Sequence, residues 1–214
     1  MLPGLRQKLG QVYRDLYRAS ADGAGDFPAR GQAGFLFVSS LAEGADRLCI
    51  EPGLIPFEHT LTAILPFARA EYEKDFLPEA SVVDPVHGTV AEFRRWLTRI
   101  GGKTAGRAVG RIIELDGSPA HRPEAYAACS EVLADHSDLL VAVFDGDIST
   151  PLGTAATVHA ALKRDMPIIL LSTAPSGEVS ILAPGGARPV PAPVEYTKEQ
   201  LARALGRRLK TRNR

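Results

Sequence analysis

The chain has 214 residues, with 25 lysines and arginines against 25 aspartates and glutamates, so its formal net charge is zero. A neutral chain has no overall field to attract nucleic acid or an acidic membrane, so the composition predicts neither as a partner. Hydrophobic residues make up 45% of the chain and charged residues 23%, as in an ordinary soluble globular protein. We expect one domain over residues 1–214.

Cysteine and histidine usage indicates neither a disulfide framework nor a metal site. Cys49 and Cys129 lack a CxxC spacing, and the five histidines show no metal-ligand spacing. No apolar run reaches the roughly 20 residues that span a bilayer, and the charged N-terminal segment is unlike a signal peptide. We therefore expect a cytoplasmic protein with no metal and no resident cofactor.

The first predicted element is a helix over Leu5–Ala19, because leucines and a valine recur there at helical spacing. An α/β fold normally begins on a strand. Either the first strand is missing from this sequence or the sheet is completed differently. Residues 20–33 are rich in Gly, Ala, Asp and Pro and predict a surface loop.

A short apolar strand over Gly34–Ser39 leads directly into the stretch SSLAEGADR. Small and polar residues at the carboxyl end of a strand stand where open α/β sheets bind ligands. Asp46 also has a plainer interpretation, as an acidic residue favoured by the dipole of a following helix. The serines, the glycine and Glu43 beside it favour a ligand pocket.

The middle of the chain alternates predicted strands and helices, which is typical of an α/β fold. In chain order we expect a strand, a helix, a strand and a helix over Thr60–Phe67, Val90–Ile100, Arg111–Leu115 and Pro123–His136. The glycine-rich stretch 101–111 lacks the first glycine of a P-loop, and no strand leads into it. We expect a flexible basic loop there.

The strongest functional signal is the stretch Asp138–Ser172, which predicts strand, loop, helix and strand. Its two unbroken apolar runs, Leu139–Phe144 and Met166–Leu171, suit a parallel sheet buried on both faces. Between them, Gly153 and Thr154 open a helix whose free backbone N–H groups and positive dipole end favour an anion. We expect an open parallel sheet with helices on both faces.

The C-terminal part predicts a loop followed by a helix. Residues 174–196 are dominated by Pro, Gly, Ala and Ser, with one short edge strand at Val179–Leu182. Thr197–Arg214 predicts a helix that begins with a capping box of Thr197 and Gln200. Basic residues suit the end of a helix, and nucleic-acid binding by this tail alone is the weaker interpretation.

Three motifs in fixed order together resemble the SLOG superfamily, the Rossmann-like group that includes the LOG enzymes and the DprA-like proteins. They are SSLAEGADRL, ILPF with EYEKDF, and SDLLVAVFDG with GTAATVHAA. The resemblance covers roughly residues 34–171 and is closest to the nucleotide-sensing branch. It implies a Rossmann-like sheet, a nucleotide or NAD-derived ligand, a role in bacterial conflict or signalling, and self-association as a homo-oligomer.

The resemblance also implies a ligand pocket at the carboxyl ends of the strands, with one wall after the first strand and another at the start of the central helix. The implied ligand-binding residues are Ser39, Ser40, Glu43, Gly44, Asp46, Tyr126, Asp145, Gly146, Gly153, Thr154 and Ala155. Tyr126 would stack on the ligand or hydrogen-bond to it, and core packing is an equal alternative for this residue.

The chain departs from the LOG enzymes at the residue that assists cleavage of the base–ribose bond. Those phosphoribohydrolases carry a PGG-x-GT-x-x-E motif, whereas this chain has Leu152 at the second glycine and Thr157 at the glutamate. A hydroxyl cannot replace a carboxylate as a general acid or base, or as stabiliser of an oxocarbenium-like transition state. Whether the chain is an enzyme stays open.

Three functions follow from these features. The first is a binding module that senses a nucleotide or an NAD-derived molecule. The alternative is a nucleotide N-glycosidase of LOG type, in which Glu43 or Asp46 supplies the missing carboxylate. A third is an interaction module whose pocket is vestigial and whose basic C-terminal tail binds a partner.

Overall fold

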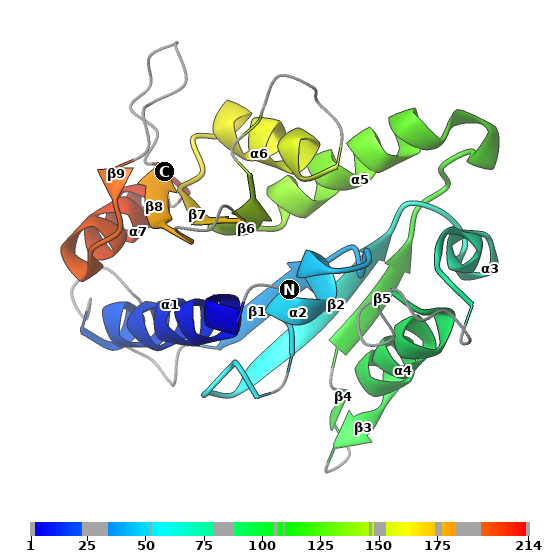
Figure 1. Ribbon diagram of the computed structural model, residues 1–214, viewed down its shortest axis with the longest axis horizontal. Helices are drawn as coiled ribbons and strands as arrows, with labels where there is room; N and C mark the ends of the chain where they lie inside the picture. The colour runs from blue at the N-terminus through cyan, green and yellow to red at the C-terminus, as the bar shows by residue number, and fades with distance from the viewer. Residues whose placement is uncertain are drawn as a thin grey trace. The chain divides into compact units, whose positions relative to one another are not determined.

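The protein has a mixed α/β structure that divides into two compact units (Figure 1). Unit 1 comprises Met1–Ala33, Gly53–Phe57 and Ser137–Arg214, and unit 2 comprises Gly34–Pro52 and Glu58–His136. The computed structural model describes residues 3–22, 34–51, 53–78, 88–104, 107–108, 110–145, 147, 153–173, 177–182 and 194–212. The single domain over residues 1–214 stays a prediction.

Unit 2 is built on a parallel three-stranded sheet in the order β1-β2-β5. The strands are β1 (Phe35–Ser39), β2 (His59–Leu65) and β5 (Gly110–Glu114). Ser39 pairs with Ala63, and Ala63 with Ile112, so the carboxyl ends of all three strands lie at the same edge. The three strands predicted for this part of the chain are confirmed, each within one or two residues.

The helices of unit 2 follow these strands. They are α2 (Ala45–Cys49), α3 (Arg69–Tyr72), α4 (Val90–Gly101) and α5 (Arg122–Asp135), with short 3₁₀ turns at Glu73–Asp75 and Pro119–His121. The Thr89 hydroxyl caps α4 by accepting a hydrogen bond from the backbone N–H of Glu92 at 3.2 Å. Figure 1 shows α4 on one side of the sheet and α5 on the other.

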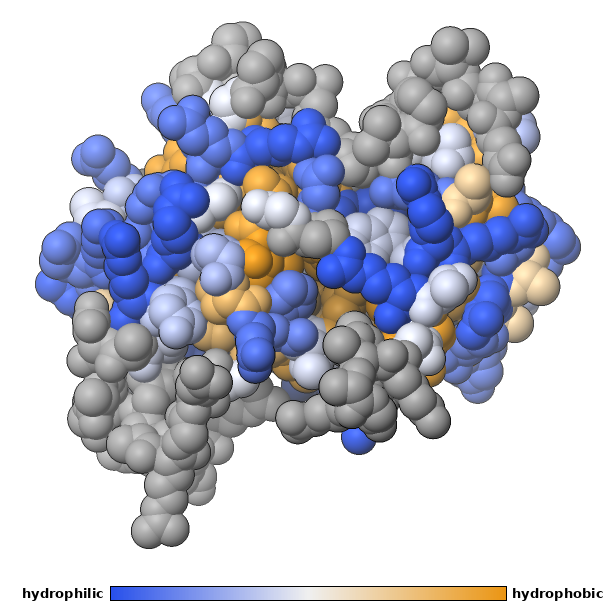
Figure 2. Space-filling view, turned by 90° about the horizontal axis from the view of Figure 1, so that it is seen from below, coloured by the Kyte–Doolittle hydropathy of each residue, from blue (hydrophilic) through white to orange (hydrophobic). Residues whose placement is uncertain are grey.

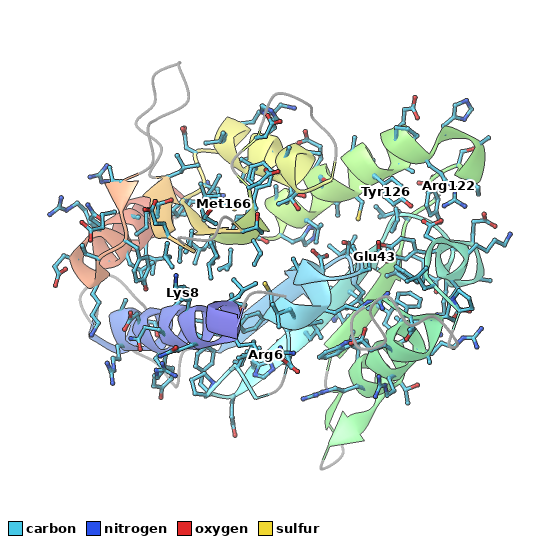
Figure 3. All side chains as sticks on the ribbon, in the orientation of Figure 1. Arg6, Lys8, Glu43, Arg122, Tyr126 and Met166 are labelled. Atoms are coloured by element: carbon cyan, nitrogen blue, oxygen red, sulfur yellow. The ribbon has the colours of Figure 1, made fainter. Side chains whose placement is uncertain are left out.

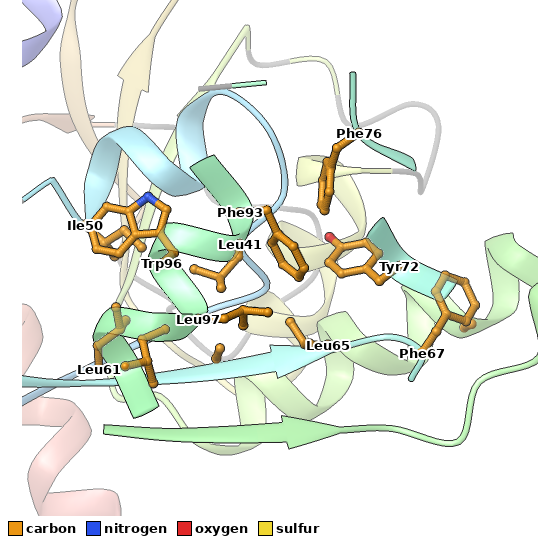
Figure 4. Close-up of a cluster of buried hydrophobic side chains, with 13 residues drawn as sticks. Leu41, Ile50, Leu61, Leu65, Phe67, Tyr72, Phe76, Phe93, Trp96 and Leu97 are labelled. Atoms are coloured by element: carbon orange, nitrogen blue, oxygen red, sulfur yellow. The ribbon is translucent and has the colours of Figure 1, made fainter. Parts of the chain in front are cut away.

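The core of unit 2 lies between the sheet and α4 (Figure 4). Apolar residues at helical spacing on α4 meet alternate residues of β2, because a strand turns every second side chain to the same face. The buried cluster consists of Leu41, Ile50, Leu61, Ala63, Leu65, Phe67, Tyr72, Phe76, Phe93, Trp96, Leu97, Ile100 and Ala125. Trp96 of α4 is buried in this core.

The flexible loop predicted for residues 101–111 is wrong in part. After Gly102 the chain forms a small antiparallel pair, β3 (Lys103–Thr104) with β4 (Arg107–Ala108), and then enters β5. A ladder of two residues on each strand is too short to leave an alternating pattern in the sequence, and so the pattern could not reveal it.

Unit 1 contains the central βαβ element that the sequence predicts. Its strands form a four-stranded sheet in the order β6-β7-β8-β9, in which β6 and β7 are parallel. The elements are β6 (Leu140–Phe144), α6 (Thr154–Lys163), β7 (Ile168–Ser172), β8 (Val179–Leu182) and β9 (Val194–Glu195). The strand–helix–strand prediction is confirmed.

The predicted parallel sheet ends at β7 in unit 1, because the strands after it are antiparallel. Strand β8 pairs antiparallel with β7 and with β9, and so it lies inside this sheet instead of at its edge. A short connection such as the one from Ser172 to Val179 can join only antiparallel neighbours, because a parallel pair needs a longer crossover.

Two helices complete unit 1, α1 (Pro3–Asp22) and α7 (Lys198–Arg212), which pack against each other. Asp15 of α1 is buried, and its carboxylate accepts a hydrogen bond from the Tyr196 hydroxyl at 3.2 Å and lies 3.7 Å from Lys198 Nζ. The Thr197 hydroxyl accepts from the backbone N–H of Gln200 at 3.2 Å, which confirms the predicted N-cap. Gln200 Oε1 is buried and has no hydrogen-bond partner in the described part of the chain, so the return bond of the predicted capping box is not made.

One residue of the basic C-terminal segment has a structural role. Arg208 Nη1 donates to the backbone carbonyl of Arg164 at 2.6 Å, and Arg164 follows the last residue of α6. The end of a helix carries unsatisfied carbonyls and a partial negative charge, so a guanidinium is stabilising there. The segment is therefore not simply a run of solvated charges.

Hydrophilic side chains cover much of the face drawn in Figure 2. The large apolar side chains that stay exposed in the described residues are Tyr17, Leu36, Ile113 and Val194. Among the helices that the structure describes, none combines the length and the apolar character needed to cross a membrane.

Gly110 lies so close to β2 that the unit 2 sheet has no room for a side chain at this position. A Cβ atom at this position would lie 1.8 Å from the carbonyl oxygen of Leu61, its partner on β2. We expect Gly110→Ala to lower the free energy of unfolding by at least about 2 kcal/mol, because the strands must separate locally to admit the methyl group. Urea denaturation measures the change.

Gly101→Ala is the matched control, because a Cβ there meets no atom within 4 Å. Its position in α4 makes alanine neutral or slightly stabilising. Equal stability of the two variants would contradict the tight approach of β5 to β2.

Candidate functional site

The carboxyl end of β1 carries a cluster of two hydroxyls and one carboxylate. Ser40 Oγ donates to Asp46 Oδ2 at 2.6 Å, and Ser39 Oγ donates to the same oxygen at 3.3 Å. The Ser39 hydroxyl also accepts from the backbone N–H of Leu41 at 3.0 Å, which leaves its own proton for Asp46. The sequence prediction placed these serines and Asp46 together, and the structure brings them into direct contact.

The loop between β1 and α2 turns sharply to make this cluster. Leu41 is fully buried at a φ of 58°, and Gly44 precedes α2 at a φ of 75°. A positive φ strains any residue with a Cβ, so the glycine suits its position. Glu43 is exposed in this loop and stands outside the contacts of the serines with Asp46. Figure 3 labels its side chain.

The buried side chain of Arg47 holds the loop between β1 and α2 in place. Its side chain is fully buried, donates through Nε to the carbonyl of Leu41 at 3.0 Å, and pairs with Glu92 of α4 at 3.0 Å. Arg47 Nη1 also donates to the Thr89 carbonyl at 2.9 Å, and the guanidinium carbon lies 4.2 Å from the centre of the Phe76 ring. Arg47 therefore ties the loop after β1 to the start of α4.

Tyr72 and Cys129 approach Asp46 from α3 and α5. Burial raises the pKa of the Tyr72 phenol well above its ordinary value, and the negative charge of Asp46 adds to the rise. Burial, and then Asp46, raises the pKa of the Cys129 thiol to about 12. Both groups are therefore neutral at physiological pH, and Asp46 supplies the negative charge in this part of the edge.

A second polar group lies between α3 and α5. Arg122 Nη2 donates to Glu71 at 2.8 Å, and Arg122 Nη1 donates to Asp75. The Tyr126 hydroxyl donates to Asp75 as well, and the ring of Tyr126 meets Phe67 edge-on at 5.5 Å between centroids. Figure 3 shows Arg122 and Tyr126 close together at the start of α5.

Tyr126 therefore combines core packing with a polar contact. Burial, and then its hydrogen bond with Asp75, raises the pKa of the Tyr126 phenol to about 12. The hydroxyl therefore remains a neutral donor. Sequence reasoning missed Arg122, Glu71 and Asp75. The spacing of the two acidic residues in EYEKDF was the available signal, since residues four apart lie on one side of a helical turn.

In unit 1 the predicted anion-binding position is the start of α6, where the chain forms the expected helix directly after Gly153. Gly153 precedes the helix at a φ of 55° and a ψ of −132°, and no side chain caps the helix at this position. The N–H groups of the first helical turn, from Thr154 and Ala155, lack intrahelical acceptors. Asp145, just after β6, accepts from the backbone N–H of Asp147 at 3.0 Å.

Gly146, a predicted ligand-binding residue, and Leu152, at which the chain departs from the LOG motif, lie outside the described residues. Thr157 lies in the first half of α6 and is half-buried. In the described part of the chain, no group of three or more His, Cys, Asp or Glu side chains could hold a metal ion.

The predicted site residues thus fall into two sets, each within one unit. Unit 2 holds Ser39, Ser40, Glu43, Gly44, Asp46 and Tyr126, and unit 1 holds Asp145, Gly153, Thr154 and Ala155. That all of them line one pocket stays a prediction.

Comparison of the chain with protein-family models, curated proteins and solved structures found no match. The SLOG resemblance therefore rests on the sequence motifs alone.

The Arg47–Glu92 pair gives the first prediction for this site. Removing one partner leaves an uncompensated buried charge, so we expect Glu92→Gln to lower the free energy of unfolding by about 3–5 kcal/mol. The double variant Arg47→Met/Glu92→Gln removes the charge and keeps an acceptor for Trp96 Nε1, which donates to Glu92 at 3.2 Å. We expect it to be less destabilised than the sum of the single variants in urea denaturation. Additive effects would contradict the pair.

The two cysteines give the second prediction. Cys129 is buried with a raised pKa, whereas Cys49 is half-buried. The thiolate is the reactive form, so we expect iodoacetamide at pH 8.5 to alkylate Cys49 at least about a hundredfold faster than Cys129. Peptide mass spectrometry over a time course measures both rates. In 8 M urea, as a control, the rates should converge. Equal rates in the native protein would show that Cys129 is accessible.

Proposed function

We propose that this protein is a sensor that binds a nucleotide or an NAD-derived signalling molecule. The observation that carries the proposal is the cluster of Ser39, Ser40 and Asp46 at the carboxyl edge of the parallel sheet in unit 2. Hydroxyls and a carboxylate on a sharply turned loop are polar groups suited to fix the orientation of a small ligand.

The position of the cluster in the sheet supports the proposal. In open α/β sheets, ligands bind outside the carboxyl ends of the strands. The chain order of β1, β2 and β5 matches their spatial order, as in one half of a doubly wound, Rossmann-like sheet. Residues from β1, α2, α3 and α5 converge at this edge.

The start of α6 in unit 1 is a separate feature that supports a phosphate-bearing ligand. Its first turn presents backbone N–H groups at the positive end of the helix dipole, and Gly153 leaves room for close approach. The SLOG resemblance predicts this helix start as the phosphate seat.

Thr157 supports sensing over hydrolysis. The position that carries the glutamate in LOG enzymes has a hydroxyl here, which cannot act as a general acid or base in their manner. Glu43 and Asp46 are the candidate carboxylates for the alternative, a nucleotide N-glycosidase. The SLOG resemblance adds two further elements to this proposal. They are a role in bacterial conflict or signalling systems, and self-association of the domain as a homo-oligomer.

Isothermal titration calorimetry against AMP, ADP, GMP, NAD and ADP-ribose tests the proposal. We expect at least one of them to bind, and Thr154→Asp to weaken that binding at least tenfold, because its carboxylate repels a phosphate by about 1.4 kcal/mol or more. An acidic residue in the first turn favours the helix, so the variant should fold.

Thr197→Asp is the matched control, since it makes the same change at the start of α7. We expect it to bind like the wild type. Chromatography of the samples after titration should recover the ligand intact, whereas release of free base would favour the N-glycosidase. Failure of all five compounds to bind the folded protein would overturn the proposal.

A further inference from the structure

Only one of the two carboxylate oxygens of Asp46 accepts hydrogen bonds from the described neighbours. Both serine hydroxyls donate to Oδ2, and among the residues that the structure describes Oδ1 receives no hydrogen bond. A carboxylate offers about four lone-pair sites, all of them acceptors. Asp46 is half-buried, and Oδ1 keeps its acceptor sites for solvent or for a ligand that brings hydrogen-bond donors.

The charge around Asp46 excludes a phosphate at this spot. In the described part of the chain Asp46 makes no ion pair, and the adjacent Arg47 is committed to Glu92 at 3.0 Å. The nearby Arg122 is committed to Glu71 and Asp75. Burial, and then the negative charge of Asp46, raises the pKa of Tyr72 and of Cys129. An uncompensated carboxylate repels anions and favours neutral or cationic donors.

We infer that Asp46 recognises the ribose of the nucleotide by accepting hydrogen bonds from its 2′- and 3′-hydroxyls. This inference rests on the proposed function and names the part of the ligand that the site in unit 2 binds. The serines show that the carboxylate takes hydroxyl donors at 2.6 Å and 3.3 Å. The cis-diol of ribose presents two such donors side by side, and a carboxylate with an open oxygen matches them.

The same chemistry could come from an amino group on the base, and the experiment separates the two sources. Calorimetry compares AMP and GMP with 2′-deoxy-AMP and 2′-deoxy-GMP, and compares AMP with IMP, which lacks the exocyclic amine. A hydrogen bond to a charged acceptor contributes about 1.5–3 kcal/mol, so we expect the 2′-deoxy forms to bind roughly ten- to a hundredfold more weakly. IMP should bind like AMP if the ribose is the group recognised.

Asp46→Asn keeps the shape of the side chain and removes its charge. We expect this variant to bind ribo and deoxy forms with affinities within about threefold of each other. Asp116→Asn is the control, because it removes a charge from an exposed aspartate of the same unit and should keep the preference for ribose. The ratio of the two affinities is the readout, because a general loss of structure would weaken both forms alike.

The outcomes separate this inference from the proposed function. Equal binding of ribo and deoxy forms by the wild type, or a preference that survives in Asp46→Asn, would overturn the role of Asp46 and leave nucleotide binding standing. A preference for AMP over IMP with no effect of the 2′-hydroxyl would assign Asp46 to the base and overturn it too. If NAD or ADP-ribose binds while AMP and GMP do not, the 2′-deoxy analogue of the compound that binds replaces 2′-deoxy-AMP, and equal affinity of the two forms would overturn the role of Asp46 in the same way. If none of the nucleotides, NAD or ADP-ribose binds the folded protein, the proposed function itself is wrong.

Discussion

The buried ion pair of Arg47 and Glu92 is the interaction on which the rest of unit 2 depends. One guanidinium joins the carbonyl of Leu41 in the loop after β1, the carbonyl of Thr89 at the start of α4, and the carboxylate of Glu92. A charge taken out of water is tolerated only when its partners are in place, so the loop, the helix start and the pair must form together. The positions of the two serines and Asp46 therefore depend on the contacts that Arg47 makes with Leu41, Thr89 and Glu92.

The carboxyl edge of the unit 2 sheet uses its acidic residues in two different ways. Glu71 and Asp75 are neutralised by Arg122, and the Tyr126 hydroxyl joins them as a further donor. Asp46 has hydroxyl donors in place of a cation, and so its charge is not neutralised by an ion pair among the described residues. Tyr126, which the sequence analysis considered as a ligand contact, belongs to the first group, because its hydroxyl donates to Asp75. The edge combines a rigid, charge-balanced half with a half that keeps its charge.

The sequence alone predicted the elements whose side chains repeat with a clear period. The apolar runs of β2, β6 and β7 and the amphipathic pattern of α4 led to elements that the structure confirms. The sequence also placed Ser39, Ser40 and Asp46 together, because Ser39 and Asp46 are only 7 positions apart at a strand–helix junction. It could not reveal that Arg47 is buried, since its partner lies 45 residues away on another helix. Arg122 was missed for the same reason, because its partners on α3 and after it are about 50 residues distant and no local pattern links them.

The pairing of α1 with α7 has a consequence for how the chain is made. Asp15 and Tyr196 are 181 residues apart, so α1 leaves the ribosome long before the helix and the tyrosine that cover it. Unit 2 lies between them in the sequence, and its own sheet and core are complete once α5 has emerged. During synthesis unit 2 can therefore fold first, because all of its residues are translated before those of α7. Unit 1 cannot be completed until α7 has been translated. For most of that time the leucine face of α1 lacks the C-terminal helix that packs against it in the folded protein, and exposed apolar surface of this kind promotes aggregation of a nascent chain.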